Sequence, residues 1–326
     1  MELAMKKIER FLAARRRSPA FSAGLVMTTL LVINAILQPG FFSLDILRSN
    51  SCTFVPLTLV AMAQAVVVLS GGIDLSVGAS VTLMNVAMAS LMGDNPLSVV
   101  LAMVVALLIG LAVGLFNGYI TAIVRLPAIV ATFASSSILS GVSLLIMPQP
   151  GGKVPRFFYS TYQMDLGNFL PVPIALFLIA LGLWLIVLRR PFGRHLYATG
   201  GNATAAFASG VRTARVKIKA YMLGGIICAL AAYLVTAQSA SGDPNMAQPL
   251  TLPSIAVVVI GGISLKGGKG KMIGAVFGAC IFGLLTNVIY FANVSSFYQD
   301  LIRGLIIILA LMLSLAPGLK AAKSAT

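Results

Sequence analysis

Residues that carry chemistry are scarce in this chain. Of its 326 residues, 10% are charged, three are cysteines and one is a histidine. A single histidine, His195, cannot build a histidine-ligated metal site or a serine–histidine–aspartate relay. Cys52, Cys228 and Cys280 fit neither a metal-binding spacing nor a disulfide framework, so we expect buried thiols. The sequence therefore predicts no bound metal and no enzyme activity.

Acidic residues are rarer than basic ones, with eight Asp and Glu against 23 Lys and Arg and a net charge of +15. Nucleic-acid binding needs basic side chains gathered on one folded surface. Here they fall in short breaks between apolar runs, so we expect no nucleic-acid partner. Ion-driven carriers usually place several ionisable groups inside their spans. Only Asp74 lies between two apolar runs, which gives little support for ion coupling.

Long apolar runs dominate what remains. The chain is 59% hydrophobic, well above the composition of soluble domains, and its mean hydropathy is +0.99. A spanning helix needs about 20 apolar-compatible residues. We predict an all-α, polytopic membrane protein with one domain over residues 1–326 and about ten transmembrane helices. These helices fall within the charge-free runs 18–44, 49–73, 75–93, 95–124, 126–152, 166–188, 220–242, 244–265, 272–299 and 304–319.

The basic residues also predict an orientation. If the N-terminus is cytoplasmic, inner segments hold 19 of the Lys and Arg and outer segments hold four. Lys and Arg accumulate on the cytoplasmic side of membrane proteins. Both termini are therefore expected in the cytoplasm, together with a basic N-terminal segment, 1–18, and the longest inner loop, 189–219.

Glycines recur at a four-residue spacing within two of the predicted spans. Such spacing allows the backbones of neighbouring helices to approach closely. We expect this packing at Gly110, Gly114 and Gly118, and again at Gly274 and Gly278.

The Gly- and Lys-rich run 266–271 resembles a phosphate-binding loop only superficially. Such a loop needs Gly five residues before its Gly-Lys pair and Ser or Thr directly after it. Here those positions hold Ile263 and Gly270 in one frame, and Leu265 and Met272 in the other. We therefore expect no ATP on this chain.

Three glycine-bearing motifs follow one another along the chain: Leu-Ser-Gly-Gly-Ile-Asp-Leu-Ser-Val-Gly at 69–78, Gly-Arg-His-Leu-Tyr-Ala-Thr-Gly-Gly-Asn at 193–202 with its continuation to 210, and Val-Val-Ile-Gly-Gly-Ile-Ser-Leu at 258–265. Together they resemble the permease subunits of ribose-type bacterial ATP-binding-cassette (ABC) sugar importers. The resemblance runs from about Leu57 to Ala310.

The motifs also predict local structure. Gly71 and Gly72 break a helix, and the carboxylate of Asp74 either caps the next one or takes part in gating toward a cytoplasmic partner. Asn202 is placed to cap a short helix over 203–209, which Gly210 would end. Segments 66–78 and 257–268 echo one another, so that Gly261 and Gly262 repeat the first break; chance composition remains an alternative explanation.

The resemblance implies a role for the short helix and a set of partners. In the resembled family this segment is the coupling helix that docks on the ATP-binding subunit; here it carries Ala203 and Thr204 where relatives often have Glu after the Asn. It also implies a second permease subunit, two ATP-binding subunits that hold ATP and Mg²⁺, a periplasmic binding protein, a small sugar as cargo and a place in the bacterial inner membrane. The coupling residues would be Gly200, Gly201, Asn202, Ala205, Ala206, Ser209 and Gly210.

Two further predictions concern the route of the cargo. The outer loop 239–254 is long enough to meet a binding protein, although it lacks the acidic Glu-Leu-Asp that relatives often carry. Uncharged polar residues inside spans either line a path or bond neighbouring helices. They are Gln64, Asn85, Asn117, Ser135, Ser136 and Asn287.

Two other functions stay open. A self-sufficient secondary carrier would transport without an ATPase, and a non-transporting membrane scaffold would bind partners but move nothing.

Overall fold

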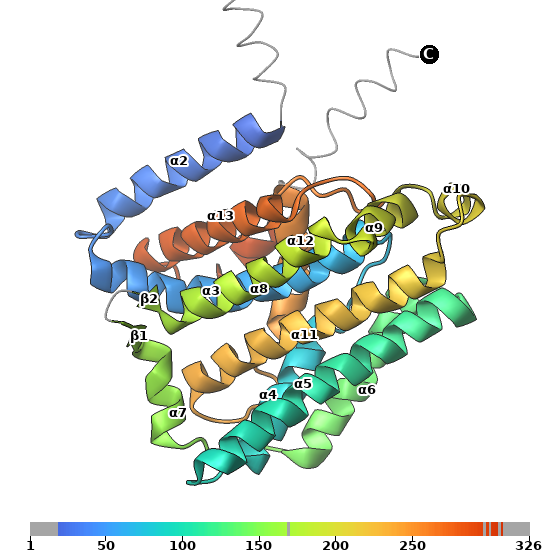
Figure 1. Cartoon of the computed structure of the whole chain (residues 1–326). Helices are drawn as coiled ribbons and strands as arrows, with labels where there is room; N and C mark the ends of the chain where they lie inside the picture. The colour runs from blue at the N-terminus through green and yellow to red at the C-terminus, as the bar shows by residue number, and fades with distance from the viewer. Residues whose placement is uncertain (1–18, 168–169, 296–297, 300, 306–307, 309–326) are drawn as a thin grey trace, which may run out of the picture.

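The computed structural model describes residues 19–167, 170–295, 298–299, 301–305 and 308. These residues are mostly helical, and the helices form one bundle (Figure 1). Within the described part, the one sheet is a two-residue antiparallel ladder of β1 (Asp165–Leu166) and β2 (Leu170–Pro171).

Within the described part of the chain, six helical segments are long and apolar enough to cross a membrane. They are α3 (Leu44–Leu69), α5 (Pro96–Tyr119) with its π-helical continuation η1 (Ile120–Val124), α6 (Ala128–Ile146), α8 (Val172–Arg189), α11 (Thr213–Ser239) and α13 (Met272–Phe291).

The remaining helices are short or contribute short apolar stretches. Val26–Leu37 within α2 (Pro19–Leu37), α4 (Val77–Leu91) and Gln248–Ile260 are apolar. The last stretch joins the 3-10 turn η3 (Gln248–Leu250) to α12 (Thr251–Ile260). The others are α7 (Arg156–Ser160), η2 (Thr161–Gln163), α9 (Pro191–Gly201) and α10 (Ala203–Ala208).

The helical class is thus as predicted, but two predicted spans hold helices shorter than a membrane crossing needs. Runs 75–93 and 244–265 contain α4, of 15 residues, and α12, of 10 residues. A charge-free run measures hydrophobicity and does not show where the backbone leaves the helix. The predicted tenth span, 304–319, lies mostly outside the described residues, and segment 1–18 lies outside them entirely.

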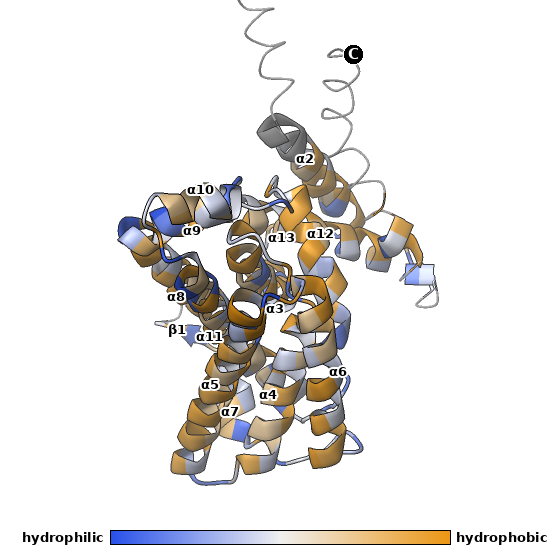
Figure 2. Ribbon diagram, turned by 90° about the vertical axis from the view of Figure 1, so that its right-hand side faces the viewer, coloured by the Kyte–Doolittle hydropathy of each residue, from blue (hydrophilic) through white to orange (hydrophobic). Residues whose placement is uncertain are grey.

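Helices α3 and α11 form the centre of the bundle. In their most apolar windows 83% and 72% of residues are buried, against 28% for α5, 28% for α6 and 17% for α8. The outer helices present large apolar side chains outward, and Figure 2 shows the apolar colouring along α5 and α6. Contact of such a surface with lipid tails is favourable, whereas its exposure to water is unfavourable.

The glycine spacing predicted close helix packing, and this is confirmed. A Cβ atom at Gly114 would lie 2.5 Å from the carbonyl oxygen of Tyr221, and one at Gly118 would lie 2.7 Å from the Cα of Ile218. Gly110 likewise meets Gly225, so α5 and α11 run antiparallel in backbone contact. Gly274 and Gly278 make the equivalent approach to α12.

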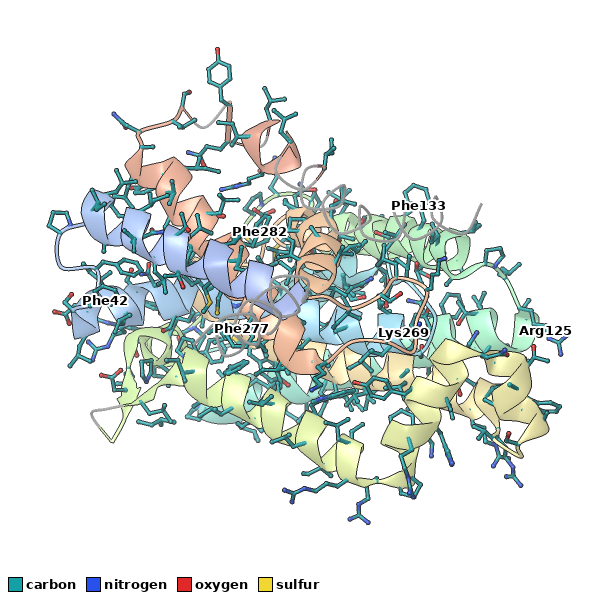
Figure 3. The ribbon with its side chains drawn as sticks, turned by 90° about the horizontal axis from the view of Figure 1, so that it is seen from above. Phe42, Arg125, Phe133, Lys269, Phe277 and Phe282 are labelled. Atoms are coloured by element: carbon teal, nitrogen blue, oxygen red, sulfur yellow. The ribbon has the colours of Figure 1, made fainter. Side chains whose placement is uncertain are left out.

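Charges sort to the two ends of the bundle. One end, here called the basic end, carries α9, α10, the start of α11 and the loop before α13; Figure 3 shows Arg125 and Lys269 on this side and Phe42 on the opposite side. Its described cations are Arg125, Arg189, Arg190, Arg194, Arg212, Arg215, Lys217, Lys219, Lys266, Lys269 and Lys271.

The opposite end, here called the paired end, holds cations with acidic partners. Arg48 pairs with Asp165, and Lys153 pairs with Asp94 at 2.5 Å. Backbone hydrogen bonds of 2.9 and 2.7 Å join Gly151 to Gly242 across two loops there. Among the described residues, the segments predicted to be inner therefore gather at the basic end, and the predicted outer loops around Arg48, Asp94 and Lys153 gather at the other.

Candidate functional site: the glycine junction and the Asp74 cluster

Helices α3 and α12 end with the same cap. In both, a glycine in the left-handed region, Gly71 at φ +85° or Gly262 at φ +78°, donates to the carbonyl three residues earlier at 2.9 Å. The next residue, Gly72 or Ile263, donates to the carbonyl five residues earlier at 3.1 Å. This is a Schellman motif, which favours glycine because its positive φ strains other residues. The echo between segments 66–78 and 257–268 therefore has a structural counterpart.

The first two glycine motifs and the loop that follows the third meet at the basic end. Gly268 donates its N–H to the carbonyl of Leu69 at 3.2 Å, and a Cβ atom at Gly267 would lie 2.8 Å from the Cα of Gly71. A Cβ atom at Gly200 would overlap the carbonyl oxygen of Leu69. We call Gly71, Gly200, Gly267 and Gly268 the glycine junction. It joins the end of α3, the end of α9 and the loop before α13 through backbone contact.

A hydroxyl adds a second link to this junction. The side chain of Tyr197, on α9, donates to the carbonyl of Gly270 at 3.1 Å. Helix α9 is therefore held to the loop between α12 and α13 at two successive points.

Helix α10 has the caps that the sequence predicts. Asn202 Oδ1 accepts from the N–H of Ala205 at 2.9 Å, and Gly210 has φ +84° just beyond the helix. Of the predicted coupling residues, Gly200 is buried in the junction, and Ala206 is the buried residue of α10. The other coupling residues are exposed. Figure 1 shows α10 at the margin of the bundle.

Sequence reasoning missed the most prominent side chain of this helix. Phe207 is 71% exposed at the basic end. The sequence offered one indication of this side chain's role: it is the only aromatic residue in a short, alanine-rich helix. Such a side chain typically anchors a protein–protein interface in a pocket of the partner.

A buried polar cluster surrounds Asp74. Its Oδ1 accepts from the backbone N–H of Ser76 at 2.8 Å and from the Ser76 hydroxyl at 2.6 Å. Asn117 donates to Ser76 Oγ at 2.8 Å and accepts from the Ser135 hydroxyl at 2.5 Å. The amide of Gln64 donates to the Asp74 carbonyl at 2.8 Å and accepts from its N–H at 3.2 Å. We call these five residues the Asp74 cluster.

The Asp74 cluster ties the break after α3 to three neighbouring helices. Ser76 precedes α4 directly, Asn117 belongs to α5 and Ser135 to α6. Asp74 bonds Ser76, the N-cap residue of α4, but no side-chain hydrogen bond caps the first turn of that helix, so the capping role stays a prediction. The role of Asp74 in gating stays a prediction as well. A carboxylate in hydrocarbon costs about 2.5–3.5 kcal/mol, so these hydrogen bonds make its buried position tolerable.

The other predicted path residues lie elsewhere. Asn85 faces the loop after α11: it donates to Thr236 Oγ1 at 2.9 Å and to the Ser241 carbonyl at 3.0 Å. Asn287 on α13 donates to Asn50 Oδ1 of α3 at 2.8 Å. Ser136 is half-buried. Three of the six residues, Gln64, Asn117 and Ser135, therefore meet in the Asp74 cluster, and the other three lie apart from it. Their place along a path stays a prediction.

The loop predicted to meet a binding protein folds inward over much of its length. Ala247 is completely buried, and its N–H bonds Thr82 Oγ1 of α4 at 3.1 Å. The sequence showed the length of the loop but not the hydroxyl and amide groups on α4 that hold it.

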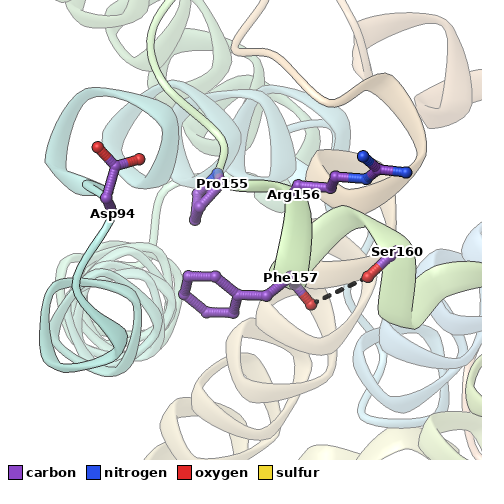
Figure 4. Close-up of a pocket in the computed structure, with 5 residues that line it drawn as sticks. All are labelled: Asp94, Pro155, Arg156, Phe157 and Ser160. Atoms are coloured by element: carbon purple, nitrogen blue, oxygen red, sulfur yellow. Dashed lines mark hydrogen bonds between the residues drawn. The ribbon is translucent and has the colours of Figure 1, made fainter.

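The paired end also carries a surface hollow, lined by Asp94, Pro155, Arg156, Phe157 and Ser160 (Figure 4). None of the predicted site residues lines it. Among the described residues there is no group of three or more His, Cys, Asp or Glu that could hold a metal ion.

Comparison with known proteins agrees with the three motifs. Residues 48–311 match the family model described as branched-chain amino acid transport system / permease component. The chain belongs to this permease family. The match covers the glycine junction, α10 and the Asp74 cluster, and together with the six long apolar helices it indicates a multi-pass protein of the bacterial inner membrane.

Curated relatives cover most of the chain. It is 36% identical to the ribose import permease protein RbsC of Bacillus subtilis, over 87% of this chain and 89% of the relative. It is 30% identical to the fructose import permease protein FrcC of Rhizobium meliloti, over 94% and 87%. It is 33% identical to the autoinducer 2 import system permease protein LsrC of Escherichia coli, over 88% and 85%. No solved structure matches the chain.

Proposed function

We propose that this permease is the membrane subunit of an ABC importer that moves a small sugar, such as ribose or another monosaccharide. Family membership and the relatives named for ribose and fructose import support this. The structural observation that carries the proposal is α10: a capped, exposed helix joined to the transmembrane bundle by a junction without side chains.

The junction suits the transmission of force. Backbones in direct contact at Gly71, Gly200 and Gly267 leave no side chain to rearrange, so a displacement of α9 and α10 has to move the end of α3. The same displacement would reach the Asp74 cluster, which begins three residues after Gly71. ATP-driven closure of a partner that grips Phe207 would thereby favour one arrangement of the bundle over another.

The two ends of the molecule suggest where the proposed partners would bind. The basic end would face the cytoplasm, with both termini and ten spans as the sequence predicts. Two ATP-binding subunits would bind there and hold ATP and Mg²⁺, and this chain would be non-catalytic and bind no cofactor. A second permease subunit would complete the path, and a periplasmic binding protein would deliver the sugar to the paired end.

The test replaces Phe207→Ser in the importer reconstituted with its ATP-binding subunits and binding protein. Loss of an anchor residue typically costs about 2 kcal/mol or more, so we expect at least about a tenfold fall in ATP-driven ribose uptake. Phe207→Leu keeps the apolar contact and should retain most of the activity. Thr204→Ala, at an exposed position on the same helix, is the matched control. Native uptake by Phe207→Ser would contradict the coupling role of α10.

Uptake by the purified chain alone separates the alternatives. A secondary carrier would concentrate sugar in proteoliposomes without an ATPase. A scaffold would retain its partners without moving sugar even in the complete assembly. The proposal requires uptake that depends on both the ATP-binding subunits and ATP.

A further inference from the structure

The chain between α11 and α12 follows α4 into the bundle instead of staying at the paired end. Asp243 donates its N–H to Asn85 Oδ1 at 2.9 Å, and Ala247 donates to Thr82 Oγ1 at 3.1 Å. At the far end of the segment, Thr251 Oγ1 accepts from the N–H of Gly78 at 3.2 Å. Successive contacts therefore descend along α4 from its middle to its first turn. We call residues 240–250 the re-entrant segment.

The contacts on α4 give the depth of this segment. With a rise of 1.5 Å per residue, Asn85 lies about 9 Å from the end of α4 at Leu91, and Gly78 lies about 20 Å from it. Apart from the turn η3, the re-entrant segment is not helical. Irregular backbone at membrane depth is tolerated only where protein buries it or where it lines a water-filled cavity.

Its polar side chains distinguish between these two environments. Asn245 is exposed, Gln248 and Asp243 are half-buried, and one Asp243 carboxylate oxygen accepts from the N–H of Asn245 at 2.8 Å. Protein therefore does not enclose them, and a carboxylate and two amides are strongly disfavoured in hydrocarbon. Water on the exposed side of the segment would hydrate these polar groups and keep them out of hydrocarbon.

We infer that the re-entrant segment lines the cargo path and that Asn245, Gln248 and Asp243 offer hydrogen bonds to the hydroxyl groups of a sugar. Amides donate and accept, and a carboxylate accepts, so this set matches a polyhydroxylated molecule without fixing its identity. The inference rests on the proposed function, because a path for cargo presupposes transport. It assigns the wall of that path to a segment that interrupts a predicted span.

The test measures water access directly, without transport. Cys52, Cys228 and Cys280 are replaced by Ala, Asn245→Cys is introduced, and the full chain in native membranes is treated with a small charged thiol reagent. Gln248→Cys is the second variant, should the first fail to fold. Val104→Cys on α5 is the matched control: its side chain is 46% exposed and lies about 12 Å along α5 from Pro96, on a face expected to meet lipid.

We expect labelling at position 245 at least tenfold faster than at 104. Equal rates would overturn the inference, whether both sites react or neither does, because the segment would then not differ from a lipid-facing or sealed surface. A second measurement addresses the sugar contact. In the reconstituted importer, Asn245→Ala should lower ribose uptake at least fivefold, whereas Val104→Ala should leave it within twofold of native.

If position 245 is labelled fast but the native assembly shows no ATP-dependent uptake, the proposed function is refuted, while the water-filled cavity beside the re-entrant segment is supported. Native ribose uptake by both Asn245→Ala and Gln248→Ala would remove the sugar contact. The two failures are thus distinguishable.

Discussion

The two ends of the molecule are held together in different ways. At the basic end, the glycine junction brings backbone against backbone, with no side chain between Leu69 and Gly200. At the paired end, side chains add to the backbone bonds between Gly151 and Gly242: Asn85 bonds the start of the re-entrant segment, and Lys153 pairs with Asp94. Backbone contact leaves no room for adjustment, whereas exposed side chains can exchange partners with water. On this basis we expect the basic end to transmit displacement and the exposed links of the paired end to open at lower cost.

The largest loss of stability is expected from a substitution that disrupts the backbone contact at the glycine junction. Gly200→Ala places a methyl group against the carbonyl oxygen of Leu69, where neither backbone can yield without moving α3 or α9. Overpacking of this kind costs about 3 kcal/mol. Gly201→Ala is the control, because its Cβ atom would meet nothing within 4 Å. Thermal unfolding in detergent should show a clear fall in midpoint for the first variant alone; equal midpoints would refute the junction.

An intermediate effect is expected at the buried side-chain link of the paired end. Asn85→Leu leaves Thr236, the Ser241 carbonyl and the Asp243 N–H without their partner. An unsatisfied buried group costs about 1–3 kcal/mol. Asn287→Leu removes one half-buried bond to Asn50 and should cost less. The same unfolding measurement ranks the two variants, and the reverse order would show that the re-entrant segment does not depend on Asn85.

The smallest effect is expected at the exposed ion pair. Lys153 and Asp94 have side chains that are 62% and 78% exposed. Pairs in this setting contribute about 0.2–1 kcal/mol and are weakened by salt. A double-mutant cycle with Lys153→Met and Asp94→Asn should give a coupling energy in this range at low salt and less at high salt. A larger, salt-independent coupling would mean that the paired end is as rigid as the basic end.

The features that could be predicted from the sequence depend on local interactions. Asn202 caps α10 and Gly210 follows it because a cap depends on residues within one turn. The cap at Gly71 was predictable for the same reason, since a left-handed residue at a helix end favours glycine. Apolar runs of about 20 residues similarly identified the long helices, because hydrocarbon thickness sets their length.

The features that could not be predicted from the sequence depend on long-range contacts. The charge-free run 244–265 gave no sign that its first part is not helical, because Thr82 and Asn85, more than 150 residues earlier, hold that part against α4. Gln64 and Asn117 were recognised as polar residues within spans, but their meeting at Asp74 depends on how four segments pack. Phe207 was visible in the sequence, and only the fold shows that it is exposed.

By itself the sequence determined the helical membrane class, the sorting of charge along the chain and the caps of individual helices, since each depends on hydrophobicity or on neighbours within a turn. The tertiary structure decided that two separate glycine motifs and the loop after a third meet at one junction, and that a polar segment enters the bundle beside α4. These features arise from contacts between residues distant in the chain, which composition and periodicity do not encode.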